Sequence, residues 1–199
     1  MIEFIYEKKE SLSPETCKEI ITLFERKTDQ QFIGRVGSGK KINRTSINKN
    51  VKNTLDINIV KNDKDWEKYV EILSSEINNN LSEYFTKLDP TNTIFHFNKI
   101  FGKITYSSYL MHKYFKDEGV FNYHNDFSID YSEYRILNYL WYLNEVEEGG
   151  ETEFFGHHIV KPECGKLIFF PSEWFFPHKG NIPRSNDKYV IAGWLYIKI

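Results

Sequence analysis

The stretch RILNYLWYLN, residues 135–144, is typical of the C-terminal half of this chain. It belongs to a series of short alternating segments, starting near Ile94, that are rich in Tyr, Phe, Ile and Trp and are separated by turn-forming residues. The series contains no convincing helical period. Such a run predicts an all-β sandwich or barrel.

Two segments before this run have a helical period. Ser13-Pro14-Glu15 supplies an N-cap, a proline at the first helical position and an acid in the first turn, which predicts a helix to about Arg26. Its apolar stripe includes Cys17, which is expected in the core. A second stripe, at three- and four-residue steps, predicts a longer helix over about 63–87. Alternation predicts strands over residues 1–6 and a half-buried strand over 55–59.

The predicted fold class is therefore α+β, mainly β. We expect a double-stranded β-helix, or jelly roll, supported by two N-terminal helices on one outer face. The 199 residues fit a single domain. Residues 1–93 would form the helical support region, with a flexible loop over 34–50, and residues 94–199 the jelly-roll core.

The segment 34–50 contains most of a phosphate-binding loop, G-x-x-x-x-G-K, at Gly34–Lys40. Lys41 stands where that motif needs a magnesium-binding Ser or Thr, and neither a buried strand nor a helix-forming run flanks the segment. We therefore interpret it as a flexible loop that could close over a site as a substrate lid.

The overall charge limits the kinds of molecule that the protein is expected to bind. A net charge of -2 gives no general attraction to phosphate backbones, so no nucleic acid is expected. The basic residues at 35, 40, 41 and 44 are the only candidate patch. The N-terminus has neither a basic segment nor a long apolar core, and no stretch has the length of a membrane span. The protein is expected to be soluble and cytoplasmic, without a membrane partner.

Two cysteines, Cys17 and Cys164, do not make a disulfide framework, which points to a reducing compartment.

The histidines are the candidate metal ligands. His124 and Asp126 form an H-x-D pair, whose side chains share one face of an extended segment. With a third ligand from a distant strand, such a pair forms the two-histidine, one-carboxylate arrangement that suits ferrous iron. We expect His178 to be that ligand. No motif supports the other four histidines: His96, His112, His157 and His158.

The order of these features resembles the 2-oxoglutarate- and iron(II)-dependent dioxygenases, and within them the prolyl 4-hydroxylase-like branch. The resemblance extends from about Leu110 to Trp194. It is carried by H-x-D, by Y-L-N-x-x-x-x-G-G-x-T-x-F over residues 142–154, and by His178 with a basic residue ten positions later. It implies a jelly-roll fold, Fe(2+), 2-oxoglutarate and O2, and it admits ascorbate as an accessory ligand.

The resemblance also implies roles for single residues. Lys188 would pair with the distal carboxylate of 2-oxoglutarate, because a buried carboxylate needs a partner charge. Arg184 is the alternative anchor, although its surroundings are typical of a loop. Further pocket residues are implied at Tyr114, Tyr142 and Trp194 for the co-substrate and at Arg135 for the substrate-facing mouth.

The activity that follows is hydroxylation of a C–H bond, with 2-oxoglutarate converted to succinate and CO2. Asp126 supports hydroxylation, since halogenating relatives lack this carboxylate. Peptidyl proline is the leading substrate by family. The alternatives are an oxygenase acting on a free amino acid or another small molecule, and a silent jelly-roll binding module, which the intact triad and Lys188 disfavour. A nucleic-acid demethylase of the superfamily is disfavoured because the R-x-N-x-T-x-R signature is absent.

Overall fold

A computed structural model describes residues 2–37, 45–93, 104–128 and 133–198. Both predicted helices are present, as α1 (Pro14–Arg26) and α2 (Lys64–Leu88). Ser13 caps α1 by accepting a hydrogen bond from the Thr16 amide, and Asp63 caps α2 in the same way through the Asp65 amide. Short 3-10 turns, η1 (Ile2–Phe4) and η2 (Thr28–Gln30), flank α1.

The described strands are β1 (Tyr6–Lys8), β2 (Phe32–Ile33), β3 (Val36–Gly37), β4 (Thr45–Ser46), β5 (Lys52–Asn53), β6 (Leu55–Ile59), β7 (Ile104–Tyr106), β8 (Tyr109–Tyr114), β9 (Val120–His124), β10 (Glu133–Tyr142), β11 (Thr152–Phe154), β12 (His158–Val160), β13 (Leu167–Pro171), β14 (His178–Gly180) and β15 (Lys188–Lys198). Every strand pair among the described residues is antiparallel.

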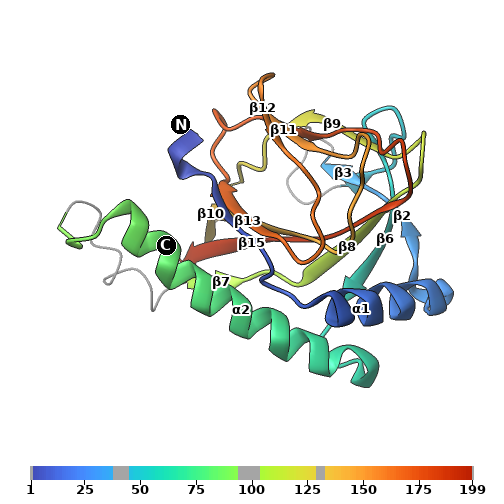
Figure 1. The fold of residues 1–199 in the computed structure, drawn as a ribbon, viewed down its shortest axis with the longest axis horizontal. Coiled ribbons are helices and arrows are strands. Elements are labelled where there is room, and N and C mark those ends of the chain that lie inside the picture. Colours follow the sequence, from blue (N-terminus) through green and yellow to red (C-terminus); the bar gives the residue numbers. More distant parts are fainter. Residues whose placement is uncertain (1, 38–44, 94–103, 129–132, 199) are drawn as a thin grey trace.

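The strands form two facing sheets. Over the described residues, the larger has the order β1-β13-β10-β15-β8-β6-β2, with β7 also paired to β15, and the smaller has the order β12-β11-β14-β9-β5. Figure 1 shows the smaller sheet above, the larger sheet in the middle, and both helices below it. The predicted jelly roll with two helices on one outer face is confirmed.

Alternation along β10 shows how the core is divided. Tyr139 and Trp141 are fully buried in the cluster between the larger sheet and the helices, with Cys17 of α1. Tyr142 points to the opposite face and belongs to the second cluster, between the two sheets, as the period of two in a strand requires. The larger sheet is therefore buried on both faces, and its inner face lines the interior of the jelly roll.

The N-terminal region contributes strands as well as helices. β1 pairs with β13, β6 pairs with β8, and β5 pairs with β9 of the smaller sheet. The strand expected over residues 1–6 is wrong in its bounds. The Ile5 amide donates to the Ile2 carbonyl at 2.9 Å and closes a turn. The strand begins only at Tyr6, which is the first residue to pair with β13.

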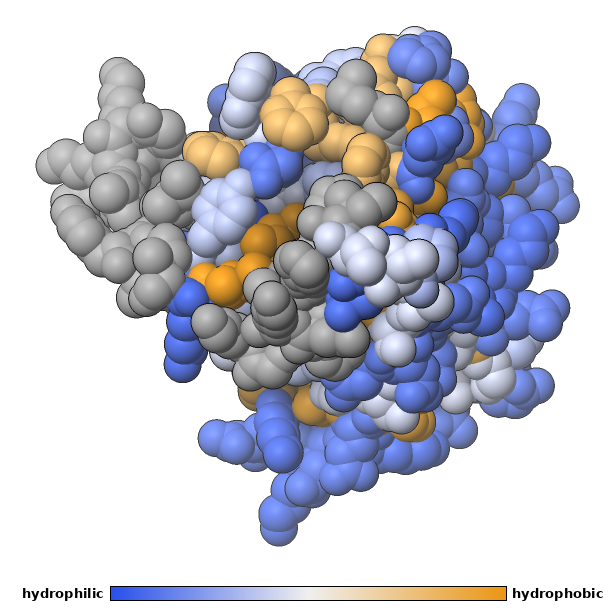
Figure 2. Space-filling model, turned by 90° about the vertical axis from the view of Figure 1, so that its left-hand side faces the viewer, coloured by the Kyte–Doolittle hydropathy of each residue, from blue (hydrophilic) through white to orange (hydrophobic). Residues whose placement is uncertain are grey.

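The helical layer presents a polar surface. The lower part of Figure 2, at the level where the helices lie in Figure 1, is mainly hydrophilic. This agrees with the one-sided apolar stripes of α1 and α2, because a surface helix turns its polar face to water. In the described residues, neither helix combines the length and apolar character that crossing a membrane would require.

The segment 34–50 begins and ends as a hairpin. β3 and β4 pair through Val36↔Ser46 and Gly37↔Thr45. Residues 38–44, which include Lys40, Lys41 and Arg44, lie outside the described residues. The role of this segment as a substrate lid stays a prediction.

Candidate active site

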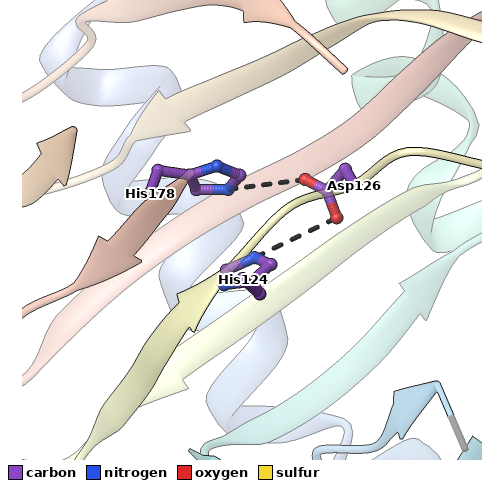
Figure 3. Close-up of side chains that lie close together, drawn as sticks. All are labelled: His124, Asp126 and His178. Carbon is purple, nitrogen blue, oxygen red and sulfur yellow. Dashed lines mark ion pairs between the residues drawn. The ribbon is translucent and has the colours of Figure 1, made fainter. Parts of the chain in front are cut away.

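His124, Asp126 and His178 come together at the ends of two neighbouring strands. His124 closes β9, Asp126 follows two residues later, and His178 opens β14, directly opposite His124 in the strand register. The Asp126 carboxylate lies 3.4 Å from His178 Nε2 and 4.0 Å from His124 Nε2, and Figure 3 shows it facing both rings. One ligand atom from each residue lies within 4.8 Å of the others. This spacing lets one metal ion contact all three.

Backbone carbonyls orient the two rings. His124 Nδ1 lies 2.8 Å from the Asn122 carbonyl, and His178 Nδ1 lies 3.3 Å from the Phe176 carbonyl. A carbonyl only accepts, so each Nδ1 carries the hydrogen and each Nε2 keeps its lone pair for a metal. Phe121 stacks on the His124 ring, with 3.6 Å between ring centroids. Two imidazoles and one carboxylate in this arrangement fit ferrous iron.

The charges of the triad also suit metal binding. Burial and the neighbouring His178 lower the pKa of His124 to about 4. Burial alone would raise the pKa of Asp126, but His178, His124 and Arg135 outweigh it and hold that pKa well below its usual range. At neutral pH the site therefore offers a neutral imidazole at His124 and an ionised carboxylate, which are the protonation states that metal ligation requires.

The triad lies where two hollows meet. An inner cavity of about 60 Å³ is lined by His178, Tyr114 and Lys188 among others, and an outer groove of about 1240 Å³ by Arg35, Arg135 and the β3–β4 hairpin. Residues lining both are His112, Phe121, His124, Asp126 and Trp194. A small molecule in the inner cavity and a larger one in the outer groove would thus reach the triad from opposite sides.

Lys188 lies at the inner end of this arrangement. Its side chain is 1% exposed, and its Nζ donates to the Gly150 carbonyl at 2.8 Å and lies 4.0 Å from the centroid of the Tyr114 ring. Burial lowers the pKa of Lys188 to about 7, against a smaller opposing effect of Glu151. Within the described residues no carboxylate lies within ion-pair distance of this ammonium. The cavity therefore holds a buried basic group without an anionic partner.

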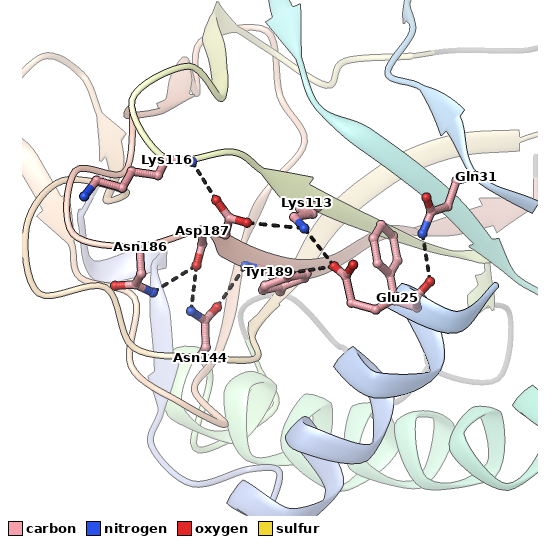
Figure 4. A network of polar contacts seen from close by, with 9 residues as sticks. Glu25, Gln31, Lys113, Lys116, Asn144, Asn186, Asp187 and Tyr189 are labelled. Atoms are coloured by element: carbon pink, nitrogen blue, oxygen red, sulfur yellow. Dashed lines mark hydrogen bonds and ion pairs between the residues drawn. The ribbon is translucent and has the colours of Figure 1, made fainter. Parts of the chain in front are cut away.

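Hydrogen bonds and ion pairs hold the residues on both sides of Lys188, Asp187 and Tyr189, in place (Figure 4). The Asp187 carboxylate accepts from the Lys116 amide at 2.8 Å and pairs with Lys113 at 3.2 Å. Asn144 donates to the Asp187 carbonyl and accepts from the Tyr189 amide. This network fixes the start of β15 and with it the direction in which the Lys188 side chain points.

The other predicted pocket residues divide into two groups. Tyr114 lines the inner cavity, opposite Lys188 in the strand register, and burial raises its pKa, so its hydroxyl stays neutral. Trp194 lines both hollows. Tyr142 is not among the residues that line the cavity; its buried hydroxyl donates to Thr152 Oγ1 at 2.6 Å, and Thr152 lines the cavity. The contact of Tyr142 with the co-substrate stays a prediction.

Arg135 lines the outer groove, and its contact with a substrate stays a prediction. Its guanidinium carbon is 4.1 Å from the centroid of the Trp194 ring, and its Nη1 donates to the Asp126 carbonyl at 3.2 Å. Arg184, the alternative anchor, is half exposed and pairs with Asp117 at 3.1 Å. It lines neither hollow. Lys188 is therefore the basic residue of the inner cavity.

The remaining histidines differ from one another. His157 is exposed and His158 is half-buried, and neither lines the hollows, whereas His96 lies outside the described residues. His112 is buried beside Asp56 and Lys52 and lines both hollows. This cluster was missed because its members are far apart in sequence and belong to no motif. The only signal was a histidine on the same predicted face as Tyr114, two residues away.

With this geometry established, comparison with known proteins becomes informative. Residues 109–196 match the family model of the 2OG-Fe(II) oxygenase superfamily, and this segment contains the whole triad and Lys188. Over this segment the chain is therefore similar to the 2OG-Fe(II) oxygenase superfamily. Among curated proteins no sequence matches the chain.

Solved structures share the fold of this chain. A viral collagen prolyl hydroxylase from Paramecium Bursaria Chlorella virus-1 is 16% identical (TM-score 0.66; 98% of this chain and 96% of that chain covered). A Pseudomonas putida prolyl-4-hydroxylase is 15% identical (0.67; 98% and 93%). A Trichoplax adhaerens prolyl hydroxylase, solved with a hypoxia inducible factor peptide fragment, is 18% identical (0.68; 98% and 84%). At such identities the likeness establishes the fold alone.

Proposed function

We propose that this oxygenase hydroxylates a C–H bond of peptidyl proline, using Fe(2+), 2-oxoglutarate and O2 and releasing succinate and CO2. His124, Asp126 and His178 are the proposed iron ligands, and Lys188 is the proposed anchor of 2-oxoglutarate. Tyr114 and Trp194 complete the co-substrate pocket, and Arg135 contacts the substrate. Ascorbate as an accessory reductant is part of the same proposal.

The observation that carries the proposal is the burial of the basic group of Lys188 without an anionic partner among the described residues. A buried ammonium without a carboxylate partner is unfavourable, and an anionic ligand would remove this penalty. The inner cavity connects Lys188 with the triad. A dianion whose two ends require a cation and a metal therefore fits both ends of one cavity, and 2-oxoglutarate is such a molecule.

When bound, the iron and its co-substrate supply the oxidising chemistry. The side chains of the protein hold the metal and the co-substrate in position and supply the charges that bind them. The two imidazoles and the Asp126 carboxylate would hold the metal through three protein ligands, a set that suits ferrous iron and leaves coordination positions for a co-substrate. Tyr114 can donate its neutral hydroxyl to the same distal carboxylate that Lys188 neutralises. An ammonium is a point charge and cannot bind a carboxylate through two parallel hydrogen bonds as a guanidinium does. The Tyr114 hydroxyl, as a second donor, would therefore help to fix the orientation of the carboxylate.

Support for a peptide substrate comes from the outer groove. Its size and its rim of two β-strands fit an extended chain better than a free amino acid. One of the similar folds was solved with a peptide fragment, and the others are prolyl hydroxylases. Trp194 and Arg135 present an aromatic face and a planar cation at the entrance to the triad, which suits an apolar ring flanked by backbone carbonyls.

The proposal can be tested with purified protein, ferrous iron and O2. We expect slow conversion of 2-oxoglutarate to succinate without substrate, and faster conversion when the correct peptide is added. Proline-containing peptides and free proline should be screened for a mass gain of one oxygen atom. Hydroxylation of free proline but no peptide would contradict the peptide class. Failure to bind 2-oxoglutarate in calorimetry would favour a binding module without catalysis.

A further inference from the structure

Three ionisable side chains next to the triad have no role in the proposed mechanism. Lys52 of β5, Asp56 of β6 and His112 of β8 are 3%, 1% and 6% exposed. Asp56 and His112 face each other in the strand register. The Lys52 Nζ lies 5.1 Å from the centroid of the Phe121 ring, which in turn stacks on the ligand candidate His124.

The Asp56 carboxylate organises this cluster. Its Oδ1 accepts from Thr54 Oγ1 at 2.7 Å and lies 2.7 Å from His112 Nδ1, and its Oδ2 accepts from Lys52 Nζ at 2.8 Å. Burial alone would raise the pKa of Asp56, but His112 and Lys52 hold it far below its usual range. Lys52 Nζ also lies 3.4 Å from His112 Nδ1, but the contact of Nδ1 with Asp56 is much shorter, at 2.7 Å. An ionised carboxylate only accepts, so His112 Nδ1 carries the hydrogen of that bond.

His112 therefore has a defined tautomer. Burial lowers its pKa, although Asp56 opposes this effect, so the ring is neutral at pH 7. With the hydrogen on Nδ1, the Nε2 atom keeps a lone pair and acts as an acceptor. Within the described residues Nε2 has no hydrogen-bond partner, and the side chain lines both the inner cavity and the outer groove. The ring thus presents an unfilled acceptor where both hollows reach the triad.

The chemistry of the acceptor selects its ligand. The 2-oxoglutarate dianion has no N–H or O–H group, so it cannot donate a hydrogen bond to His112 Nε2. Stability does not explain the cluster either, because a buried ion pair contributes no more than well-packed apolar residues of similar volume. The missing partner is a hydrogen-bond donor that enters through the outer groove, which is the side from which the substrate approaches.

We propose that His112 is a substrate-binding residue whose Nε2 accepts a hydrogen bond from a backbone N–H of the substrate, with Asp56 and Lys52 as positioning residues that fix its tautomer and orientation. This inference rests on the proposed function and narrows its substrate class. Proline has no N–H, so the donor is the amide of a residue next to the hydroxylated proline. The site therefore requires a donating residue at that position.

The test compares two probes that differ by one donor. The first is a peptide of alternating proline and glycine. The second is its depsipeptide, in which an ester oxygen replaces each glycine N–H without a change in shape. Both are titrated by calorimetry into protein loaded with zinc and 2-oxoglutarate. We expect wild-type protein to bind the peptide roughly 5- to 100-fold more tightly than the depsipeptide, as expected for one buried hydrogen bond. The variant His112→Leu should bind both equally.

A second variant is the control for unfolding of His112→Leu. In Lys52→Met/Asp56→Leu/His112→Leu the whole cluster becomes apolar at similar volume, a change that buried ion clusters can tolerate. It should retain the circular dichroism of the wild type and, like His112→Leu, lose the preference for the peptide. A 2-oxoglutarate dissociation constant close to wild type in both variants would place the contact on the substrate side.

Three results would overturn the inference: a peptide preference that persists without His112, equal binding of both probes by the wild type, or binding of neither probe. The last result would exclude this peptide class. Failure of the proposed function looks different, because the iron-loaded protein would then not consume 2-oxoglutarate at all.

Discussion

The Nζ atom of Lys188 lies over the ring of Tyr114, 4.0 Å from its centroid, and the two residues are direct partners across β15 and β8. Cation–π contact stabilises the ammonium partly, but it does not replace a counter-ion. The pair therefore forms a binding site that is already assembled before an anion enters.

The first prediction concerns this anchor. Lys188→Ala would leave the distal carboxylate of 2-oxoglutarate buried and unpaired, at a cost on the order of 2 to 5 kcal/mol. That corresponds to a dissociation constant weaker by roughly thirtyfold or more, measured by calorimetry. The matched control is Arg184→Ala, which removes an exposed cation outside both hollows and should leave the constant unchanged. The reverse pattern would move the anchor to Arg184.

The second prediction is a pH dependence. Lys188 has a pKa of about 7 in the empty cavity, and a bound carboxylate favours the ammonium and raises that pKa. Below pH 7 the residue is already protonated, so affinity for 2-oxoglutarate should be flat. Above pH 7 binding must take up a proton, and affinity should fall by up to about tenfold per pH unit. Calorimetry in buffers of different ionisation enthalpy measures this uptake.

Lys188→Arg supplies the control for that experiment. A guanidinium remains protonated in proteins, so any 2-oxoglutarate binding that this variant retains should show no proton uptake between pH 7 and 9. If the variant and the wild type have the same pH profile, another group is responsible for it.

The third prediction concerns the triad. His124→Ala or His178→Ala should reduce iron affinity by more than about 100-fold, the upper end of the loss seen for residues that merely support a ligand. Turnover of 2-oxoglutarate should disappear while circular dichroism is retained. His157→Ala is the control, since that exposed side chain lines neither hollow. Normal iron content in either triad variant would refute the ligand assignment.

The fourth prediction concerns stability. Asp56→Ala leaves Lys52 buried without its partner at 2.8 Å, which should lower the free energy of unfolding by about 3 to 5 kcal/mol in denaturant titration. Asp117→Ala removes an aspartate from the exposed pair with Arg184. The loss there should stay below about 1 kcal/mol. Comparable losses in the two variants would mean that Asp56 is not a buried partner.

Much of the fold was predictable because its signals are local. The caps Ser13 and Asp63 and the three- and four-residue apolar steps define α1 and α2. The jelly roll and the spacing from His178 to Lys188 followed from motifs. Prediction failed where tertiary context decides. The alternation over 55–59 predicted a half-buried strand with Asp56 on its polar side; Asn58 is exposed there, but Asp56 is buried among its partners Lys52, Thr54 and His112, which no local pattern reveals. The contact of Tyr142 with the co-substrate stays a prediction, because a strand pattern assigns a side chain to a face and gives no depth within the barrel.

One glycine sets a limit on which oxoacids the cavity can accept. Gly180 follows His178 by two residues on β14, so both lie on the same face, roughly 6.6 Å apart along the strand. A methyl group at Gly180 would lie 3.2 Å from the Tyr114 hydroxyl and 3.5 Å from Lys188 Nζ. His178 at the metal end and Gly180, next to the Lys188 amine of β15, therefore lie on one strand, which fixes the distance between the two ends of the cavity. Five-carbon 2-oxoglutarate should be preferred over four-carbon oxaloacetate, which is too short to reach the ammonium, and over six-carbon 2-oxoadipate, which must buckle.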